Sequence, residues 1–478
     1  MAHEVSGNPP CRHNCPLNID VPAFLARIAL GKYREAFELI RAVNPFPITC
    51  GYICHHPCEK HCRAGGNGEP ISIRALERFA GDYVLAHGFS ALPQNEAPML
   101  EKVAIIGAGP AGLSAAYQLA RLGYQPTVFE TSPVAGGRLA LAVPEFRLPR
   151  RITELEVECI KQAGVNVLTN TPAGPNLTID DLITGGFRAV LLAVGARTGL
   201  KLGLPDEDAP GVMPALSFLE AVRGHKPVSL GDWVAVIGGE DSAVDSARSA
   251  RRLRSRDVSI IFPGTRTEMP ANEDNIEAAL EEGVKIVENT APTRFIARNN
   301  HLVALECQTL EPYECDEKGK PRLVPIPGSE FIFPVDNAIV ASGEQPDLSL
   351  LPEGKTLPTT NNNTIQVDPE TFSTGEPGVF VAGRAVSNHF AIADSILSGK
   401  LAALSIHDFL RGKREFPTTS PSPPTTTPKM IEKVFERRRL PVRRSPAPER
   451  VSGFGLVELG YDERTAVMEA RRCPGCVE

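Results

Sequence analysis

A glycine-rich turn that follows a strongly apolar run most constrains how this chain folds. The run Val103–Ile106 leads at once into Gly107-Ala108-Gly109-Pro110-Ala111-Gly112, and apolar residues then recur at helical spacing from Leu113 to Leu122. In such a strand–turn–helix unit the first glycine permits the tight turn, the second lets a pyrophosphate approach the backbone, and the third lets helix and strand pack closely. Glu130 ends the next β-rich run, about 20 residues further on, where an acid can hydrogen-bond a ribose. The pattern predicts a dinucleotide site; the alternative is a purely structural turn.

A second unit of the same kind follows later in the chain. From Lys102 onward, short runs rich in β-branched residues alternate with helical stretches, which is typical of an α/β fold with a parallel sheet. The second unit opens with Trp233–Ile237, continues through a helix over 242–253 and reaches the run Val258–Phe262. We expect two nested Rossmann-like nucleotide-binding domains, the second inserted in the first. Further buried-strand candidates are 189–194, 337–341 and 378–382.

The remaining segments suggest how these domains are flanked. Apolar residues at helical spacing predict helices over 21–30, 33–43 and 72–87. Residues 416–428 are rich in Pro, Thr and Ser and predict an extended connector. The predicted domains are a helical domain over 1–98, a first nucleotide-binding domain formed by 99–230 and 336–412, an inserted domain over 231–335, a linker over 413–450 and a C-terminal segment over 451–478.

Charge and hydropathy exclude several classes of protein. The 478 residues carry 50 Lys and Arg against 57 Asp and Glu, a net charge of −7, which argues against nucleic acid or an anionic membrane as the main partner. No apolar run reaches the roughly 18 residues that span a bilayer. The first ten residues lack the basic start and apolar stretch of a secretory signal. We therefore expect a cytoplasmic protein with no membrane span and no nucleic-acid partner.

Eight of the eleven cysteines lie near the two ends of the chain. In a reducing compartment a cluster of cysteines favours metal ligation over disulfides, because thiols there are kept reduced. The other three, Cys159, Cys307 and Cys315, are isolated and are given no role, because a lone cysteine is most often a small packing residue or an exposed thiol. The end cysteines are Cys11, Cys15, Cys50, Cys54, Cys58 and Cys62 in the helical domain, and Cys473 and Cys476 close to the C-terminus.

Several stretches together carry a family resemblance. They are Cys-Pro-Leu-Asn-Ile-Asp-Val-Pro (15–22), Asn-Pro-Phe-Pro (44–47), Cys-Gly-Tyr-Ile-Cys (50–54), Pro-Cys-Glu (57–59), the glycine turn (107–112), Pro-Glu-Phe-Arg-Leu-Pro (144–149), Glu-Met-Pro-Ala (268–271) and Pro-Gly-Val-Phe-Val-Ala-Gly (377–383). Over roughly residues 10–410 the chain resembles the small, flavin-containing subunit of bacterial glutamate synthase. It is similar also to the N-terminal part of dihydropyrimidine dehydrogenase and to NADPH-dependent ferredoxin oxidoreductase subunits. The resemblance implies that FAD is the first dinucleotide, held by Gly107, Gly109, Pro110, Ala111, Gly112, Glu130, Gly137, Arg138, Arg147, Gly383 and Arg384.

The resemblance also implies two [4Fe–4S] clusters in the helical domain. Cys15, Cys54 and Cys58 match three ligands of one cluster, and Glu77 stands where the family uses a Gln or a similar oxygen ligand. Cys50 is the alternative to Glu77, because it continues the regular cysteine spacing of this region. A zinc site is the other alternative, since cysteine sets are common zinc ligands.

The second cluster matches the family at only two positions, Cys11 and Cys62. In the family the other two ligands lie just before the first of these, within a Glu-Ala-x-Arg-Cys-x-x-Cys pattern. Here that pattern stands at 469–476, so we predict that the C-terminal segment returns and that Cys473 and Cys476 complete the cluster. Two alternatives stay open, namely that the pair ligates in a partner or a second copy, or that the tail is inert.

The nicotinamide site departs from the family pattern. Its candidate residues are Gly238, Gly239, Glu240, Ser242 and Arg266. Glu240 replaces the glycine that lets a pyrophosphate approach, and the next strand ends in Phe262 rather than in the family's tyrosine and paired arginines. NADPH binding, NADH or weak binding, and a vestigial site all stay open. A further departure is Arg384, where the family has an aspartate; it either raises the flavin potential or points elsewhere.

These observations lead to one functional interpretation and one alternative. The resemblance implies an oxidoreductase subunit that passes electrons between FAD and [4Fe–4S] clusters, and to or from a larger catalytic subunit or a ferredoxin-like protein, with NADPH or NADH as a further cofactor. The alternative is an adaptor with a vestigial nicotinamide site, whose FAD exchanges electrons only through clusters or a partner. No side chain is expected to act as an acid or a base.

Overall fold

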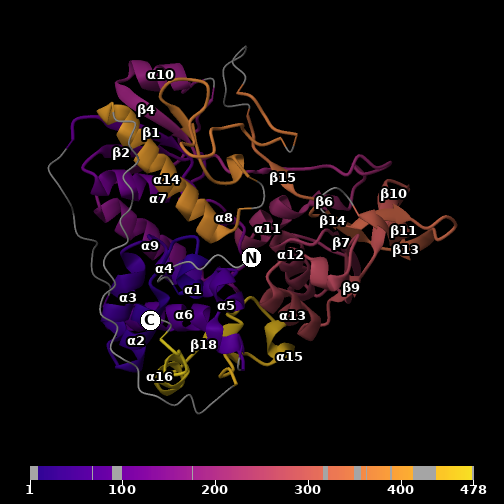
Figure 1. Cartoon of the computed structure of the whole chain (residues 1–478). Coiled ribbons are helices and arrows are strands. Elements are labelled where there is room, and N and C mark those ends of the chain that lie inside the picture. Colours follow the sequence, from indigo (N-terminus) through magenta and orange to yellow (C-terminus); the bar gives the residue numbers. More distant parts are fainter. Residues whose placement is uncertain are drawn as a thin grey trace.

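The computed structural model describes residues 9–66, 68–88, 99–174, 176–315, 321–348, 357–361, 363–387, 390–412 and 438–475. Figure 1 shows the N-terminal helices in indigo, with a first nucleotide-binding domain above them and an inserted domain beside both. The C-terminal segment, in yellow, lies against the N-terminal helices. In the part of the chain given by these ranges, no helix combines the length and hydrophobicity needed to cross a membrane.

The N-terminal domain is a cluster of short helices. Helix α2 begins where the Asp20 side chain accepts a hydrogen bond from the Ala23 backbone at 3.2 Å, and Gly31, with φ +74°, follows its end. The helices predicted over 21–30, 33–43 and 72–87 correspond to α2, α3 and α6. The elements are α1 (Pro10–His13), α2 (Val21–Ala29), α3 (Tyr33–Arg41), α4 (Pro47–Ile53), α5 (Pro57–Lys60), the 3₁₀ helix η1 (Arg63–Gly66) and α6 (Ile73–His87).

The first nucleotide-binding domain is a five-stranded parallel sheet in the order β16-β4-β1-β2-β3. Its central strands are buried on both faces, which is why they read as continuous apolar runs. Helices α7 and α14 pack along each other over one face (Figure 1). The elements are β1 (Lys102–Ile106), α7 (Pro110–Arg121), β2 (Gln125–Phe129), α8 (Arg138–Leu141), α9 (Arg150–Gln162), β3 (Asn166–Leu168), α10 (Ile179–Thr184), β4 (Phe187–Leu192), β16 (Val379–Val381), η3 (Gly383–Ala385) and α14 (Ile392–Arg411).

The inserted domain contains a second parallel sheet, in the order β6-β14-β7-β8-β9. It also carries an antiparallel sheet, in which β11 pairs with β10, β12 and β13, and which the sequence analysis did not predict. The elements are β6 (Val212–Pro214), α11 (Ala215–Arg223), β7 (Trp233–Ile237), α12 (Asp241–Arg252), β8 (Asp257–Ile261), η2 (Arg266–Glu268), α13 (Glu273–Glu281), β9 (Lys285–Val287), β10 (Thr290–Arg298), β11 (His301–Cys315), β12 (Pro321–Pro325), β13 (Phe331–Pro334) and β14 (Asn337–Val340).

The two domains are nested, as predicted. The chain leaves the first sheet after β4 and returns to it at β16, and the two crossing segments pair as the antiparallel strands β5 (Thr198–Gly199) and β15 (Glu344–Gln345). The inserted domain is larger than the range 231–335, because β6 and β14 belong to its sheet. A buried apolar run such as Asn337–Val340 does not reveal in its sequence which of two parallel sheets it joins.

The C-terminal segment folds onto the N-terminal helices. Helix α16 lies against α2 and α6, and the Tyr33 hydroxyl donates to Glu463 at 2.8 Å. Residues 438–450, predicted as part of a linker, include a strand and a short helix, whereas the Pro/Thr-rich stretch 416–428 lies outside the described residues. The elements are β17 (Arg443–Arg444), α15 (Ala447–Arg450), β18 (Glu458–Gly460) and α16 (Glu463–Ala470).

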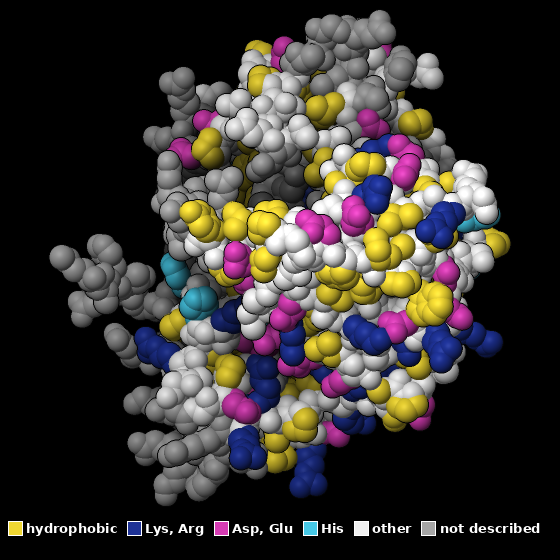
Figure 2. Space-filling model, turned by 90° about the vertical axis from the view of Figure 1, so that its right-hand side faces the viewer, with side chains coloured by type: hydrophobic (Ala, Val, Ile, Leu, Met, Phe, Trp, Pro, Cys, Tyr) yellow, Lys and Arg dark blue, Asp and Glu magenta, His cyan; other side chains and the backbone are white. Residues whose placement is uncertain are grey.

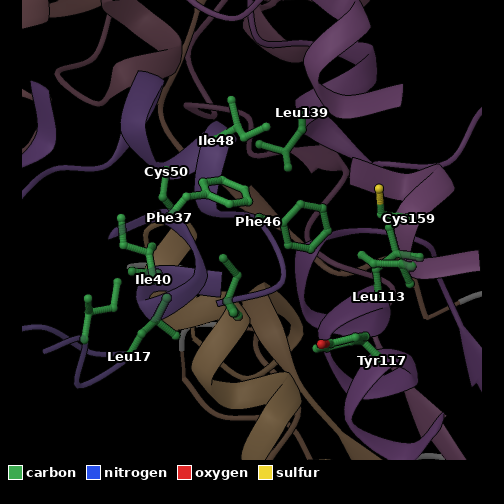
Figure 3. Packing of buried hydrophobic residues seen from close by; sticks show 14 of the residues in the cluster. Leu17, Phe37, Ile40, Phe46, Ile48, Cys50, Leu113, Tyr117, Leu139 and Cys159 are labelled. Carbon is green, nitrogen blue, oxygen red and sulfur yellow. The ribbon is translucent and has the colours of Figure 1, made fainter. Parts of the chain in front are cut away.

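One hydrophobic core runs from the N-terminal domain into the first nucleotide-binding domain. Figure 3 shows Phe46 and Ile48 of the N-terminal domain close to Leu113 and Leu139 of the other. The boundary is reinforced by Glu156 of α9, whose buried carboxyl group accepts hydrogen bonds from the Ile48 and Thr49 backbone amides and the Thr49 hydroxyl. The two domains therefore hold a fixed relation to each other.

Candidate functional site

The first glycine turn has the geometry that the sequence predicts. Gly107 has φ +105°, and a Cβ there would lie 2.4 Å from the Ala193 carbonyl oxygen. A Cβ at Gly112 would lie 2.0 Å from the Gly107 carbonyl oxygen. A Cβ at Gly109 would meet nothing within 4 Å. Two of the glycines are therefore required by close packing, and the third leaves open space in front of the N-terminus of α7.

That space belongs to a cavity of about 600 Å³ between the first nucleotide-binding domain and the inserted domain. Figure 2 shows that this side of the molecule is hollowed in its upper half. Glu130 lies in the cavity wall and is 6% exposed; its Oε2 accepts from the Ala108 amide at 2.8 Å and its Oε1 from the Ser132 amide at 2.7 Å. The predicted flavin residues in the wall are Gly107, Gly109, Pro110, Ala111, Glu130, Gly137, Arg138, Arg147, Gly383 and Arg384; Gly112 packs behind it.

The arginines predicted to hold the flavin are engaged with carboxylates. Buried Glu344 lies between Arg138, at 3.1 Å, and Arg384, at 3.2 Å. Burial lowers the pKa of Arg138. Arg147 instead bonds Asp245 of the inserted domain at 2.7 Å and lies 3.4 Å from Asp241. The glycine turn, the open N-terminus of α7 and the buried acid Glu130 fit a dinucleotide. The positive charges of the arginines are already largely balanced by carboxylates before a dinucleotide binds.

The second glycine turn repeats the first in its backbone. Gly238 has φ +139°, and a Cβ there would lie 2.2 Å from the Ala341 carbonyl oxygen, as one at Gly107 would from Ala193. Glu240 is the N-cap of α12 with φ −78° and ψ 172°, close to the φ −79° and ψ −179° of Gly109 at α7. The backbones match, but the second unit has a glutamate side chain where the first leaves space.

The end of the next strand differs as well. A Cβ at Gly239 would lie 2.4 Å from a ring carbon of Phe262, so an aromatic ring stands where Glu130 places its carboxylate in the first unit. Of the predicted nicotinamide residues, Glu240 and Ser242 line the cavity, and Gly238 and Gly239 form the turn beside it. Arg266 lies on η2, where its backbone amide donates to Glu288 at 2.8 Å, and it is not among the cavity residues.

The first set of cysteines surrounds a small buried cavity. Its lining includes Cys15, Cys54, Cys58, Glu77 and the alternative ligand Cys50. Burial raises the pKa of these thiols, to about 12 for Cys54. Glu77 is 7% exposed, its Oε1 has no hydrogen-bond partner among the described residues, and burial raises its pKa to about 8. Thiols and an unpartnered carboxylate oxygen around one cavity fit an iron–sulfur cluster.

Within the described ranges, no three or more His, Cys, Asp or Glu side chains form a group suited to holding a metal ion.

The structure describes three cysteines of the second set, Cys11, Cys62 and Cys473. Cys11 and Cys473, 7% and 8% exposed, belong to the same hydrophobic core, and Cys62 packs against it. The C-terminal segment is held there by Arg472, which donates to the Glu69 carbonyl at 2.8 Å. The predicted return of the C-terminal segment is thus present in the fold. Cys476 lies outside the described residues.

Sequence reasoning missed a network between the cysteine cavity and the inserted domain. His55 bonds Asp241 at 2.5 Å, His56 lies 3.3 Å from Asp274, and the Asn272 side chain donates to the Cys54 carbonyl at 3.4 Å. The histidine pair between Cys54 and Cys58 was a signal in the sequence. Their acidic partners, about two hundred residues away, carry no local pattern that marks them.

Comparison with known proteins supports this description. Residues 101–396 match the family described as "Pyridine nucleotide-disulphide oxidoreductase", and residues 5–89 the family described as "Dihydroprymidine dehydrogenase domain II, 4Fe-4S cluster". The chain is 38% identical to the NADP(+)-dependent formate dehydrogenase subunit beta of Moorella thermoacetica, over 98% of this chain and 70% of that protein. It is 31% identical to the glutamate synthase [NADPH] small chain of Escherichia coli (strain K12), over 84% of this chain and 89% of that protein.

A solved structure shares the fold. FprA of Mycobacterium tuberculosis, in complex with NADPH, matches with a TM-score of 0.58 at 17% identity, over 66% of this chain and 85% of that one. Together the matches confirm the expected resemblance, the Rossmann-like domains, the oxidoreductase class and a cofactor set of FAD and [4Fe–4S] clusters. Which residues contact each cofactor stays a prediction.

Proposed function

The chain belongs to the pyridine nucleotide-disulphide oxidoreductase family, and from that premise we propose that it passes electrons between FAD and two [4Fe–4S] clusters, to or from a larger redox partner. It is a flavin and iron–sulfur oxidoreductase of the kind found as a subunit of electron-transfer complexes. Relatives with names of this kind include the beta subunit of a formate dehydrogenase and the small chain of a glutamate synthase.

The observation that carries the proposal is a wall shared by the two cavities. Ile53 and His55 line the large cavity, while Cys54 and His56 line the cysteine cavity. Successive residues of one short segment thus face the flavin side and the cluster side in turn. Electron transfer between two centres needs them close together, and this segment separates them by little more than one backbone.

Separate sets of residues are positioned to hold the flavin and the cluster. FAD, when bound, supplies the conversion between a hydride pair and single electrons, which protein side chains cannot perform. The glycine turn at Gly107–Gly112 and the acid Glu130 are positioned to hold its phosphates and ribose. Cys15, Cys54, Cys58 and Glu77 would hold one cluster, with iron taking the place of the thiol protons. The described site offers no side chain that needs to act as an acid or a base.

The pyridine nucleotide is the natural partner of the flavin in this proposal, with NADPH or NADH at the N-terminus of α12. A second candidate is an adaptor with a vestigial nicotinamide site. It is favoured by Glu240 at the N-cap of α12 and by the Phe262 ring on Gly239. In that case the flavin exchanges electrons only with the clusters or with a partner subunit.

An anaerobic titration of the purified holoprotein tests both candidates. NADPH, then NADH, then dithionite are added while the visible flavin absorbance is followed. Rapid bleaching by either nucleotide supports the first candidate. Bleaching by dithionite alone supports the adaptor. A protein that contains neither flavin nor iron after anaerobic purification would contradict the proposal as a whole.

The second cluster has a test of its own. We propose that Cys473 and Cys476 complete it with Cys11 and Cys62, because the chain just before Cys473 is held on the N-terminal domain, where Arg472 donates to the Glu69 carbonyl. Changing Cys473 and Cys476 to Ser should remove about four irons per chain, the content of one cubane. Cys159→Ser and Cys307→Ser are matched controls, since both are buried cysteines away from these cavities. Unchanged iron content in the double variant would contradict the assignment.

A further inference from the structure

The two strand–turn–helix units differ at one point that faces the shared cavity. In the first unit the N-cap of the helix is Gly109, and a Cβ there would meet nothing within 4 Å. In the second unit the N-cap is Glu240, with almost the same backbone conformation, and it lines the same cavity. A helix N-terminus attracts phosphate through its free N–H groups and its dipole. A carboxylate thus stands where the equivalent unit keeps room for phosphate.

The Glu240 side chain does not serve its own helix. It makes no capping hydrogen bond to α12, and its Oε2 lies 3.6 Å from the Arg384 guanidinium, which belongs to the first nucleotide-binding domain. Arg384 is 19% exposed and also pairs with Glu344, which in turn pairs with Arg138. The Glu240–Arg384 pair therefore bridges the two domains across the cavity, within a cluster of two positive and two negative side chains.

We propose that Glu240 and Arg384 form a charge gate that weakens pyridine-nucleotide binding at the N-terminus of α12. The carboxylate, which is 31% exposed, repels the incoming phosphates, because two anions a few ångströms apart repel each other even near a protein surface. Arg384 offsets part of that repulsion by neutralising Glu240. The gate rests on the nicotinamide part of the proposed function. It also explains Glu240 and Arg384, the two departures from the family pattern, as one feature, because these side chains pair with each other.

The gate predicts opposite effects for its two members. Binding of NADP⁺ and of NAD⁺ to the FAD-loaded holoprotein is measured by titration calorimetry. Glu240→Gln keeps the size of the side chain and should tighten binding about tenfold, the effect of removing one nearby like charge. Arg384→Gln should weaken binding by a similar factor. When Glu240 is already Gln, Arg384→Gln should reduce nucleotide affinity by a smaller factor, because no carboxylate is left for the arginine to neutralise.

A matched control separates this effect from net charge. Glu306 pairs with Arg294 at 3.2 Å in the antiparallel sheet of the inserted domain and does not line the cavity. Glu306→Gln changes the charge of the chain by the same amount and should leave nucleotide affinity unchanged. Each variant is checked for native FAD and iron content. If Arg384→Gln loses FAD, the charge gate is tested by the nucleotide affinities of Glu240→Gln and Glu306→Gln alone.

The gate is overturned if Glu240→Gln changes both affinities by less than twofold, or if it binds neither nucleotide. It is overturned also if Glu306→Gln tightens binding as much as Glu240→Gln does. The proposed function is judged separately, by iron content and by reduction with dithionite, neither of which needs a nucleotide. Failure of the gate and failure of the electron-transfer function are therefore distinguishable.

Discussion

At the scale of single residues, we predict that flavin retention depends on Glu130. It is buried in the cavity wall, and both of its oxygens accept backbone N–H groups, from Ala108 and Ser132. Glu130→Ala removes the acceptor for the ribose and leaves these two amides unsatisfied. We expect FAD to bind about ten- to a hundredfold more weakly, the usual cost of losing a hydrogen bond to a charged group.

The FAD retained after gel filtration, and the Kd of the refilled protein, measure this effect. Glu130→Gln keeps one acceptor oxygen and should fall between the native protein and the alanine variant. An alanine variant that keeps a full complement of FAD would show that Glu130 only shapes the loop.

A second residue, Glu156, makes a prediction about pH. Burial raises its pKa to about 8, despite the hydrogen bonds from Ile48 and Thr49 that favour the ionised form. The folded protein therefore holds a proton on this group at pH values where the unfolded chain has lost it. The resulting stability is complete below the ordinary glutamate pKa and is lost as the pH rises through about 8.

Replacing this carboxyl should flatten the pH dependence of stability. Between about pH 5 and pH 8 the native protein should lose up to about 1.4 kcal/mol per pH unit relative to Glu156→Gln, since the amide does not titrate. Thermal melting across this range measures the difference. Glu158→Gln, on the same helix but 56% exposed, is the control and should follow the native curve. Parallel curves for native protein and Glu156→Gln would contradict the prediction.

At the scale of elements, strand β18 anchors the C-terminal segment. Its Glu458 accepts hydrogen bonds from Arg74 at 3.0 and 2.8 Å and lies 3.3 Å from Arg78, both on α6. Burial favours the neutral acid, but these arginines outweigh it and lower the pKa of Glu458 to about 2. This contribution to stability is present above the ordinary glutamate pKa and is lost as the pH falls toward about 2.

Removing the anchor should release the segment. Glu458→Ala leaves two buried guanidinium groups short of a counter-charge, at a cost of about 3–5 kcal/mol. We expect limited proteolysis to cleave within residues 438–475 much faster than in the native protein, as read by mass spectrometry. Glu449→Ala, an exposed acid in the same segment, is the control. Equal cleavage rates for both variants would place the anchor elsewhere.

The elements also show what the sequence was able to predict. Strands such as Trp233–Ile237, which is buried from its second residue on, were recognisable because a buried strand is a continuous apolar run between turn residues. The antiparallel sheet of the inserted domain was not, because its strands are only partly buried and their exposed positions break the apolar pattern. No pattern in the sequence over His301–Cys315 distinguished the long strand β11 from a loop.

The candidate site divides in the same way. Gly107 and Gly238 were predictable, since a backbone with positive φ pressed against a carbonyl admits only glycine. The partners of Glu240 and of His55 were not, because Arg384 and Asp241 are brought to them by the nesting of the domains and not by any local pattern. The sequence motifs thus identified the two glycine turns, whereas the charged side chains that meet beside them are determined by the fold.

At the scale of the whole molecule, Arg147 joins the three domains around the large cavity. It comes from the first nucleotide-binding domain and is 11% exposed, bonding Asp245 and lying close to Asp241 on α12 of the inserted domain. Asp241 in turn bonds His55 of the N-terminal domain. Burial would raise the pKa of Asp241, but Arg147 and His55 outweigh it and hold that pKa well below its usual value. The guanidinium is thus the counter-charge of an interdomain contact, at a position where the resemblance implies flavin binding.

Arg147→Met separates these two roles. It leaves buried Asp245 and half-buried Asp241 without the guanidinium, at a cost of about 3–5 kcal/mol. We expect faster hydrogen exchange in α12 and around His55, with the sheet of the first nucleotide-binding domain unchanged. Adding Asp241→Asn and Asp245→Asn removes the unpaired charges and should restore slow exchange. Arg147→Lys should restore slow hydrogen exchange only in part, because one ammonium group does not bridge two carboxylates as a guanidinium does. If the triple variant exchanges as fast as Arg147→Met while both have lost FAD, then Arg147 acts through the flavin and the bridge between domains is incidental.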